Sequence, residues 1–108
     1  ATWCKPCISS FQHYENLIRD FSGNEVEFIF LSVDNQPDKW KQFIAERKVP
    51  DGKHFIEKDK GAVYDAFKFY GIPRYILIGR DGRIIDANAP RPGSTEIKEL
   101  LSKYIVNN

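Results

Sequence analysis

The two cysteines of this chain lie three residues apart, in Trp3-Cys4-Lys5-Pro6-Cys7, where the sequence predicts that a helix begins. They are the only cysteines among 108 residues. Residues at positions i and i+3 share one helical face, with about 5–6 Å between their Cβ atoms, so the pair is close to disulfide geometry. A helix start offers unpaired N–H groups and a partial positive charge, and both favour the reactive thiolate. So small a ring would be a weak structural clip, so the spacing favours a redox-active pair.

Length and composition predict one domain over residues 1–108. Eight Phe, five Tyr and two Trp, in a chain that is 42% hydrophobic, supply apolar surface for a single core. The formal net charge of +1 gives no broad basic field for nucleic acid or a membrane surface, and no apolar run is long enough to cross a bilayer. The chain opens at Ala1, without Met and directly at the cysteine motif, so we expect it to be N-terminally truncated.

Apolar residues at three- and four-residue steps predict four helices. The first starts at Lys5 or Pro6, because proline is tolerated in a first turn, and ends at residues 22–24. Its apolar stripe comprises Ile8, Phe11, Tyr14, Ile18 and Phe21.

The other helices are bounded by cap and turn signals, and their large apolar side chains are interpreted as core: Trp40, Phe43, Phe67 and Tyr70. The predicted bounds are a start near Pro37 and a stop near Lys48, a cap at Asp59 and an end at Gly71, and a final cap at Ser94 or Thr95.

Strands are predicted between these helices. Residues 26–33 are almost continuously apolar, branched and aromatic, which is typical of a strand buried on both faces in a parallel sheet. Asp81-Gly82 predicts the turn of an antiparallel hairpin. Helices alternating with strands favour a layered α/β fold. The other predicted strands cover residues 53–57, 74–78 and 83–87.

Three stretches together resemble one family. The cysteine motif opens a helix, Leu31-Ser-Val-Asp34 ends a strand, and Gly71-Ile72-Pro73 precedes the hairpin. This pattern resembles the thioredoxin fold, and within it the TlpA/ResA-like thiol-disulfide oxidoreductases; residues 85–92 are similar to Bacteroidota members. The resemblance covers essentially the whole chain. It implies a sheet with helices on both faces, a C-terminal β-hairpin and helix, and a central insertion that holds Trp40 and residues 54–55 and 64–70.

The resemblance also implies roles for the motif residues. Cys4 is expected to be the exposed nucleophile that attacks a substrate disulfide, and Cys7 is expected to resolve the mixed disulfide. Lys5 and Pro6 are expected to tune the pair, through charge and through restricted flexibility. Trp3 offers an apolar rim for substrate, or packs in an ordinary way.

A second segment is expected to meet the substrate. In relatives the Ile-Pro loop packs beside the cysteines, so the Ile72–Pro73 peptide bond is expected to be cis, and the backbone of Ile72 is expected to pair with an extended substrate. Arg74 either meets substrate or is an ordinary surface arginine.

The chain departs from the family pattern at three places. Ser10 and Gln12 stand where many relatives have Glu and Pro, and the strand that normally precedes the cysteine motif is missing. Without it, the strands at residues 26–33 and 74–79 each lose a neighbour. We expect that these strands pair directly, that another chain supplies a strand, or that upstream residues lie outside this numbering.

Several functional readings follow. The leading one is a protein thiol-disulfide oxidoreductase, for which action as a reductant is favoured over action as an oxidant. The alternatives are a thiol peroxidase and a non-catalytic binding module. No cofactor or metal is expected, because His13 and His54 lack ligand spacing and Ile8 stands where haem attachment requires His. The family implies protein thiols as substrates, a membrane electron donor and a place outside the cytoplasm. The protein is expected to be a monomer, or a strand-exchanged dimer.

Overall fold

The computed structural model describes residues 1–21, 23, 26–46 and 49–106 of the chain. Helices and strands alternate along the sequence, which confirms the predicted α/β class. The ends predicted for the first helix at Ser22 and Asn24, and for the second at Lys48, lie outside the described residues. The elements are α1 (Lys5–Ser9), α2 (Phe11–Phe21), β1 (Ile29–Ser32), α3 (Pro37–Glu46), β2 (Lys53–Ile56), α4 (Ala62–Phe67), β3 (Leu77–Ile78), β4 (Ile84–Asp86) and α5 (Thr95–Val106).

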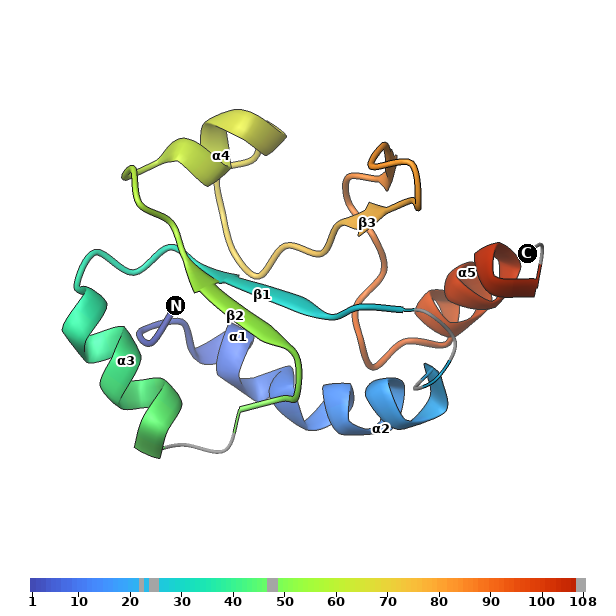
Figure 1. Ribbon diagram of the computed structural model, residues 1–108, viewed down its shortest axis with the longest axis horizontal. Helices are drawn as coiled ribbons and strands as arrows, with labels where there is room; N and C mark the ends of the chain where they lie inside the picture. The colour runs from blue at the N-terminus through green and yellow to red at the C-terminus, as the bar shows by residue number, and fades with distance from the viewer. Residues whose placement is uncertain (22, 24–25, 47–48, 107–108) are drawn as a thin grey trace.

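The strands form two separate pairs. β1 runs parallel to β2, with Ile29 opposite Lys53 and Ser32 opposite Ile56. β3 runs antiparallel to β4 around Asp81-Gly82, where Gly82 has φ +82° and so takes the left-handed conformation that favours glycine. Figure 1 shows the β3–β4 hairpin standing apart from the β1–β2 pair. The predicted short strand and hairpin are confirmed.

A groove separates the two strand pairs. Within the described residues β1 and β3 share no ladder, so the prediction that they pair directly is wrong. The groove has a volume of about 1030 Å³, and β1 and β3 contribute Ile29, Leu31, Leu77 and Ile78 to its lining. We call this cavity the inter-strand groove.

The two faces of β1 differ in burial. Tyr14 of α2 packs edge-on against Phe28 and Phe30, with ring centroids 6.3 and 4.8 Å apart, so a helix covers that face. The alternate residues Ile29 and Leu31 are 58% and 46% exposed. The prediction of a strand buried on both faces is therefore wrong, because one face opens toward solvent.

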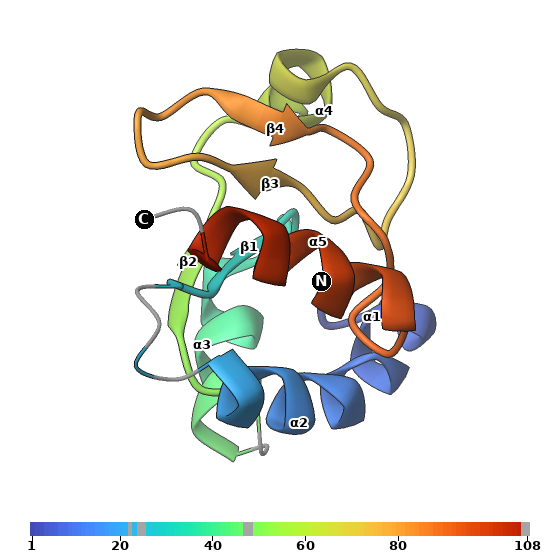
Figure 2. The ribbon, with the colours of Figure 1, turned by 90° about the vertical axis from the view of Figure 1, so that its right-hand side faces the viewer.

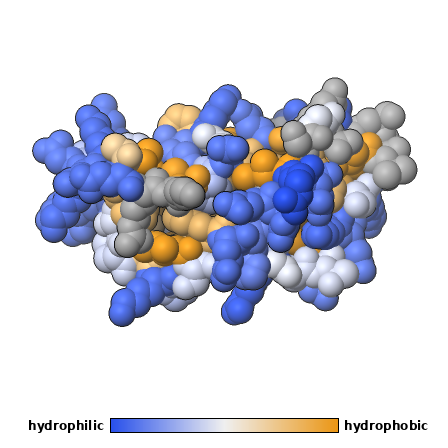
Figure 3. Space-filling model, turned by 90° about the horizontal axis from the view of Figure 1, so that it is seen from below, coloured by the Kyte–Doolittle hydropathy of each residue, from blue (hydrophilic) through white to orange (hydrophobic). Residues whose placement is uncertain are grey.

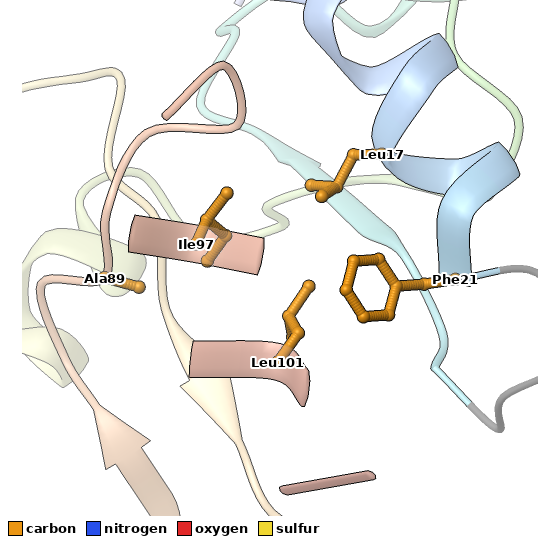
Figure 4. Close-up of a cluster of buried hydrophobic side chains, with 5 residues drawn as sticks. All are labelled: Leu17, Phe21, Ala89, Ile97 and Leu101. Carbon is orange, nitrogen blue, oxygen red and sulfur yellow. The ribbon is translucent and has the colours of Figure 1, made fainter. Parts of the chain in front are cut away.

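The core lies between α2 and α5. Side chains from both helices meet, together with one residue from the loop before α5 (Figure 4). An ion pair between Lys98 of α5 and Asp20 of α2, at 2.8 Å, spans the same interface. In Figure 2, α5 lies between the hairpin and α2. The buried cluster comprises Leu17, Phe21, Ala89, Ile97 and Leu101.

The first predicted helix is broken at Ser10. Its N–H reaches the carbonyls of Pro6 and Cys7, and its hydroxyl donates to the Cys7 carbonyl at 2.6 Å. A serine hydroxyl that bonds back to the preceding turn competes with the regular helical ladder and bends a helix. One predicted helix therefore becomes α1 and α2, and α1 ends within two turns of Cys4.

The bounds predicted for the third helix are wrong at both ends. Gly61, not Asp59, is the N-cap of α4, because Asp59 contributes its backbone carbonyl to a turn with Ala62. Lys68 takes the left-handed conformation (φ 57°) and ends the helix three residues before Gly71. Tyr70 is consequently 94% exposed, which contradicts its predicted core role.

Phe69 is buried in place of Tyr70, and it packs edge-on against Tyr64 with centroids 5.1 Å apart. Trp40, Phe43 and Phe67 are only partly buried. At the start of α5 the Ser94 hydroxyl accepts the N–H of Ile97 at 3.3 Å, which confirms Ser94 as the cap.

One face of the molecule is mainly polar. Seen from below Figure 1, hydrophilic residues cover most of the face, with smaller hydrophobic patches between them (Figure 3). Among the described residues, no helix has both the length and the apolar character needed to span a membrane.

Candidate active site

Cys4 is the N-cap of α1, and the helix begins at Lys5, as predicted. The sulfur of Cys4 accepts a hydrogen bond from the backbone N–H of Cys7 at 3.3 Å. Pro6 lies in the first turn, where its missing N–H has no helical partner to lose. The helix start therefore directs an unpaired backbone donor at one sulfur of the pair.

The two cysteines form a disulfide across this first turn. Their Cα atoms are 5.3 Å apart and their sulfurs are 2.06 Å apart. The predicted ability of Cys4 and Cys7 to form a disulfide is confirmed. The Ser10 hydroxyl donates to the Cys7 carbonyl and so braces the turn.

The exposure of the two cysteines differs from the prediction. Cys4 is only 4% exposed in this disulfide form, whereas Cys7 is partly buried and lines the inter-strand groove. The expectation that Cys4 is the exposed sulfur is therefore wrong for the oxidised state. Cys4 also closes a tight turn before the helix starts, because its N–H bonds to the Ala1 carbonyl at 3.1 Å.

The residues flanking the cysteines face solvent. Trp3 is 63% exposed, which excludes an ordinary core role for its ring. Lys5 and Pro6 are exposed as well. All three are accessible to a macromolecule that approaches the disulfide.

The Ile72–Pro73 peptide bond is cis, as predicted. Both residues are partly buried and belong to the lining of the inter-strand groove, which Cys7 also lines. Arg74 is engaged within the fold, because its Nε donates to the Ala87 carbonyl at 2.9 Å and its guanidinium lies 5.3 Å from the Phe69 ring centroid.

One part of the site was missed by sequence reasoning. Asp34, at 6% exposed, follows β1 and accepts hydrogen bonds from the Thr2 N–H at 2.9 and 3.1 Å, from the Thr2 hydroxyl at 2.7 Å and from the Ser32 hydroxyl. Burial alone would raise the pKa of Asp34, but the hydrogen bonds from Ser32 and Thr2 outweigh it and lower the pKa. An acidic residue directly after an apolar strand, with Ser two places earlier, was the available signal.

The described residues do not gather metal-binding side chains at one place. Over residues 1–21, 23, 26–46 and 49–106, no three His, Cys, Asp or Glu side chains gather closely enough to hold a metal ion. What the site does contain is one disulfide, a helix start, a cis-proline loop and a buried carboxylate.

Comparisons with known proteins agree with this geometry. The sequence model of a family described as thioredoxin-like matches residues 1–84. ResA, a thiol-disulfide oxidoreductase of Bacillus thuringiensis subsp. konkukian, is 29% identical over 106 residues, which cover 95% of this chain and 58% of ResA. CycY, a thiol:disulfide interchange protein of Rhizobium leguminosarum bv. viciae, is 27% identical over 94% of this chain and 52% of its own length.

A solved structure gives the same result. The crystal structure of a candidate thiol-disulfide oxidoreductase from Bacteroides vulgatus superposes with a TM-score of 0.86, at 33% identity, over 96% of this chain and 72% of the other. The chain thus spans 58% of the length of ResA and most of the solved relative. The predicted resemblance is confirmed, and the chain belongs to the thioredoxin-like family.

Proposed function

We propose that this protein is a thiol-disulfide oxidoreductase that exchanges the Cys4–Cys7 pair with protein substrates, acting mainly as a reductant. One observation carries the proposal: the disulfide spans the first turn of α1, with a backbone N–H aimed at the Cys4 sulfur. A hydrogen bond from an N–H group favours the thiolate, which is the form that attacks disulfides. ResA, a thiol-disulfide oxidoreductase, and CycY, a thiol:disulfide interchange protein, support the same reaction class.

In the reductive direction, the Cys4 thiolate attacks one sulfur of a substrate disulfide. A Cys4–substrate bond forms, the substrate S–S bond breaks, and the other substrate sulfur leaves as a thiolate that takes up a proton. The Cys7 thiolate then attacks Cys4, which restores the disulfide and releases the second substrate thiol. Two electrons pass from the protein to the substrate, and the Cys7 N–H stabilises the Cys4 thiolate as nucleophile. In the reverse, oxidising direction the same N–H stabilises the Cys4 thiolate as leaving group.

The flanking residues supply the docking surface. We assign Trp3 to apolar contact with substrate, supported by its exposure, and Lys5 and Pro6 to the rim around the disulfide. The backbone of Ile72, before the cis-proline, pairs with an extended substrate segment. Because Cys4 is enclosed, a substrate sulfur reaches it only after neighbouring side chains shift.

The proposal extends to the setting of the protein. Residues 1–108 work as one thioredoxin-like unit, outside the cytoplasm, where protein disulfides persist. The electrons come from a membrane reductant, and the substrates are cysteines of other exported proteins. Among the described strands, β1 and β3 each have an unpaired edge, and a second copy that adds a strand there would form a dimer. Without such an exchange the protein is a monomer. Sedimentation equilibrium over a range of concentrations distinguishes these two states.

Reduction of insulin disulfides by the reduced protein, together with trapping by single-cysteine variants, tests the reaction. We expect turnover by the wild type, none by Cys4→Ser, and a stable one-to-one mixed disulfide with Cys7→Ser. Ser9→Ala, on the exposed side of α1, is the matched control and should retain full activity. Trapping by Cys4→Ser instead would show that Cys7 is the nucleophile, and no turnover by the folded, reduced wild type would refute the activity.

A further inference from the structure

We propose that Asp34 is a positioning residue for Cys4: it ties the turn that carries the nucleophile to the end of β1. The inference rests on the proposed function, because it concerns the reactivity of the same cysteine. Asp34 and Cys4 are 30 positions apart in the sequence, yet three hydrogen bonds join Asp34 to Thr2, two residues before Cys4.

The geometry is that of a filled acceptor site. One carboxylate oxygen accepts the Thr2 N–H at 3.1 Å and the Thr2 hydroxyl at 2.7 Å. The other oxygen accepts the same N–H at 2.9 Å and the Ser32 hydroxyl. A carboxylate this deeply buried is tolerated only with such partners, since an unpaired buried charge is strongly unfavourable. The side chain is therefore held in one orientation.

Ser32 fixes the carboxylate from the side of the strand. Its hydroxyl donates to Asp34, while the same oxygen accepts the Asp34 N–H at 3.0 Å. The Ser32 carbonyl in turn accepts the N–H of Glu57 at 2.9 Å, where the strand pair ends. The acceptor that holds Thr2 is thus anchored to the β1–β2 ladder.

Thr2 transmits this anchor to the cysteine. It lies inside the turn closed by the 3.1 Å hydrogen bond from the Cys4 N–H to the Ala1 carbonyl. The Cys4 carbonyl then accepts the N–H of Ile8 at 3.1 Å, in the first turn of α1. Cys4 is therefore fixed between a strand-anchored turn and a helix, which keeps its sulfur in line with the Cys7 N–H.

The test measures how the alkylation rate of Cys4 by iodoacetamide depends on pH, in a Cys7→Ser background where only one thiol reacts. Asp34→Ala removes both the charge and the acceptor, Asp34→Asn removes the charge but keeps one acceptor oxygen, and Thr2→Val keeps the charge but removes the hydroxyl donor. Asp65→Ala, at an exposed position on α4, is the control. Circular dichroism checks that each variant is folded.

For a positioning role, Asp34→Ala should raise the pH midpoint by about one unit toward the ordinary thiol value of about 8.5. Thr2→Val should shift the midpoint in the same direction by less, and Asp34→Asn and Asp65→Ala should stay close to the parent. Equal downward shifts in both Asp34 variants, with Thr2→Val unchanged, would show a purely electrostatic effect and overturn the proposal. Unchanged midpoints would also overturn it.

The outcome is defined even if Asp34→Ala does not fold. Thr2→Val keeps the buried carboxylate but lacks the hydroxyl, whereas Thr2→Ser keeps both. A midpoint that is raised in Thr2→Val and equals the parent value in Thr2→Ser supports the positioning role. Identical midpoints in these two variants would refute it. Alkylation requires no turnover, so this result stands apart from the insulin assay that tests the proposed function.

Discussion

The backbone N–H of Cys7 points at the sulfur of Cys4, 3.3 Å away, so the residue that we propose resolves the mixed disulfide also donates a hydrogen bond to the sulfur of its partner. Both properties come from one turn of helix, because the third N–H of a helix is unpaired and lies above the N-cap side chain. A cysteine at the N-cap uses the position that Ser, Thr or Asp ordinarily occupies.

This donor predicts an acidic thiol in the reduced protein. In the Cys7→Ser variant, whose residue 7 keeps its N–H, the pH midpoint for alkylation of Cys4 should lie below the ordinary value of about 8.5. In roughly 6 M guanidinium, which unfolds small domains, the midpoint of the same variant should return to that value. A folded midpoint equal to the unfolded one would mean that the helix start does not act on the sulfur.

Asp34 predicts a specific acid response of stability. Its pKa is lowered in the folded state, so its carboxylate contributes stability that is fully present above its unfolded pKa of about 3.9 and is lost as the pH falls through the folded pKa. Urea unfolding of the wild type and of Asp34→Asn should therefore differ most near pH 7. The difference in free energy of unfolding should shrink below about pH 4. A difference that stays constant down to pH 3 would contradict the assigned shift.

Core burial predicts unequal costs for two identical substitutions. Leu17→Ala, at a residue that is 3% exposed between α2 and α5, should lower the free energy of unfolding by about 2–5 kcal/mol. Leu31→Ala, at a residue 46% exposed in the inter-strand groove, should cost about half as much or less. Chemical denaturation measures both. Equal costs would show that Leu31 is covered in solution.

Amide hydrogen exchange probes the open edge of β1. The carbonyls of Phe28 and Ser32 accept hydrogen bonds from the N–H groups of Lys53 and Glu57, so alternate residues of β1 turn their backbone groups toward β2. The N–H groups of Ile29 and Leu31 therefore face the groove, and they should exchange much faster than those of Phe30 and Ser32. Exchange followed by NMR tests this. Equal protection at all four amides would reveal a strand on this edge.

Much of the fold was readable from the sequence because local signals coincide with it. The cysteine motif with Pro6 marks the helix start, Asp81-Gly82 marks the hairpin, and Ser94 marks the last cap. The cis-proline followed from the family resemblance and not from the residues alone. Each of these features depends on a few neighbouring residues.

The sequence predictions are wrong where the local structure depends on a distant part of the molecule. A strand such as residues 26–33 has the composition of a buried strand, but its burial depends on a second neighbouring strand, and the described residues place none on the free edge of β1. The helix end at Lys68 required a lysine in the left-handed region, for which Gly71 was the better local candidate. The contact of Asp34 with Thr2 joins a strand end to a turn 32 residues away, so the local pattern marks Asp34 but does not specify its partner.

The separation of the strand pairs bears on how the molecule holds together as a unit. With no shared ladder among the described strands, hydrogen bonding in the β1–β2 pair gives no support to the hairpin. Leu77 of β3 and Tyr75 just before it, together with Val26 and Phe28 just before β1, instead pack against the same five-residue cluster of α2, α5 and Ala89. The β1–β2 pair and the hairpin are thus coupled in unfolding by side-chain packing. Loosening that cluster would let each of these two strand pairs unfold on its own.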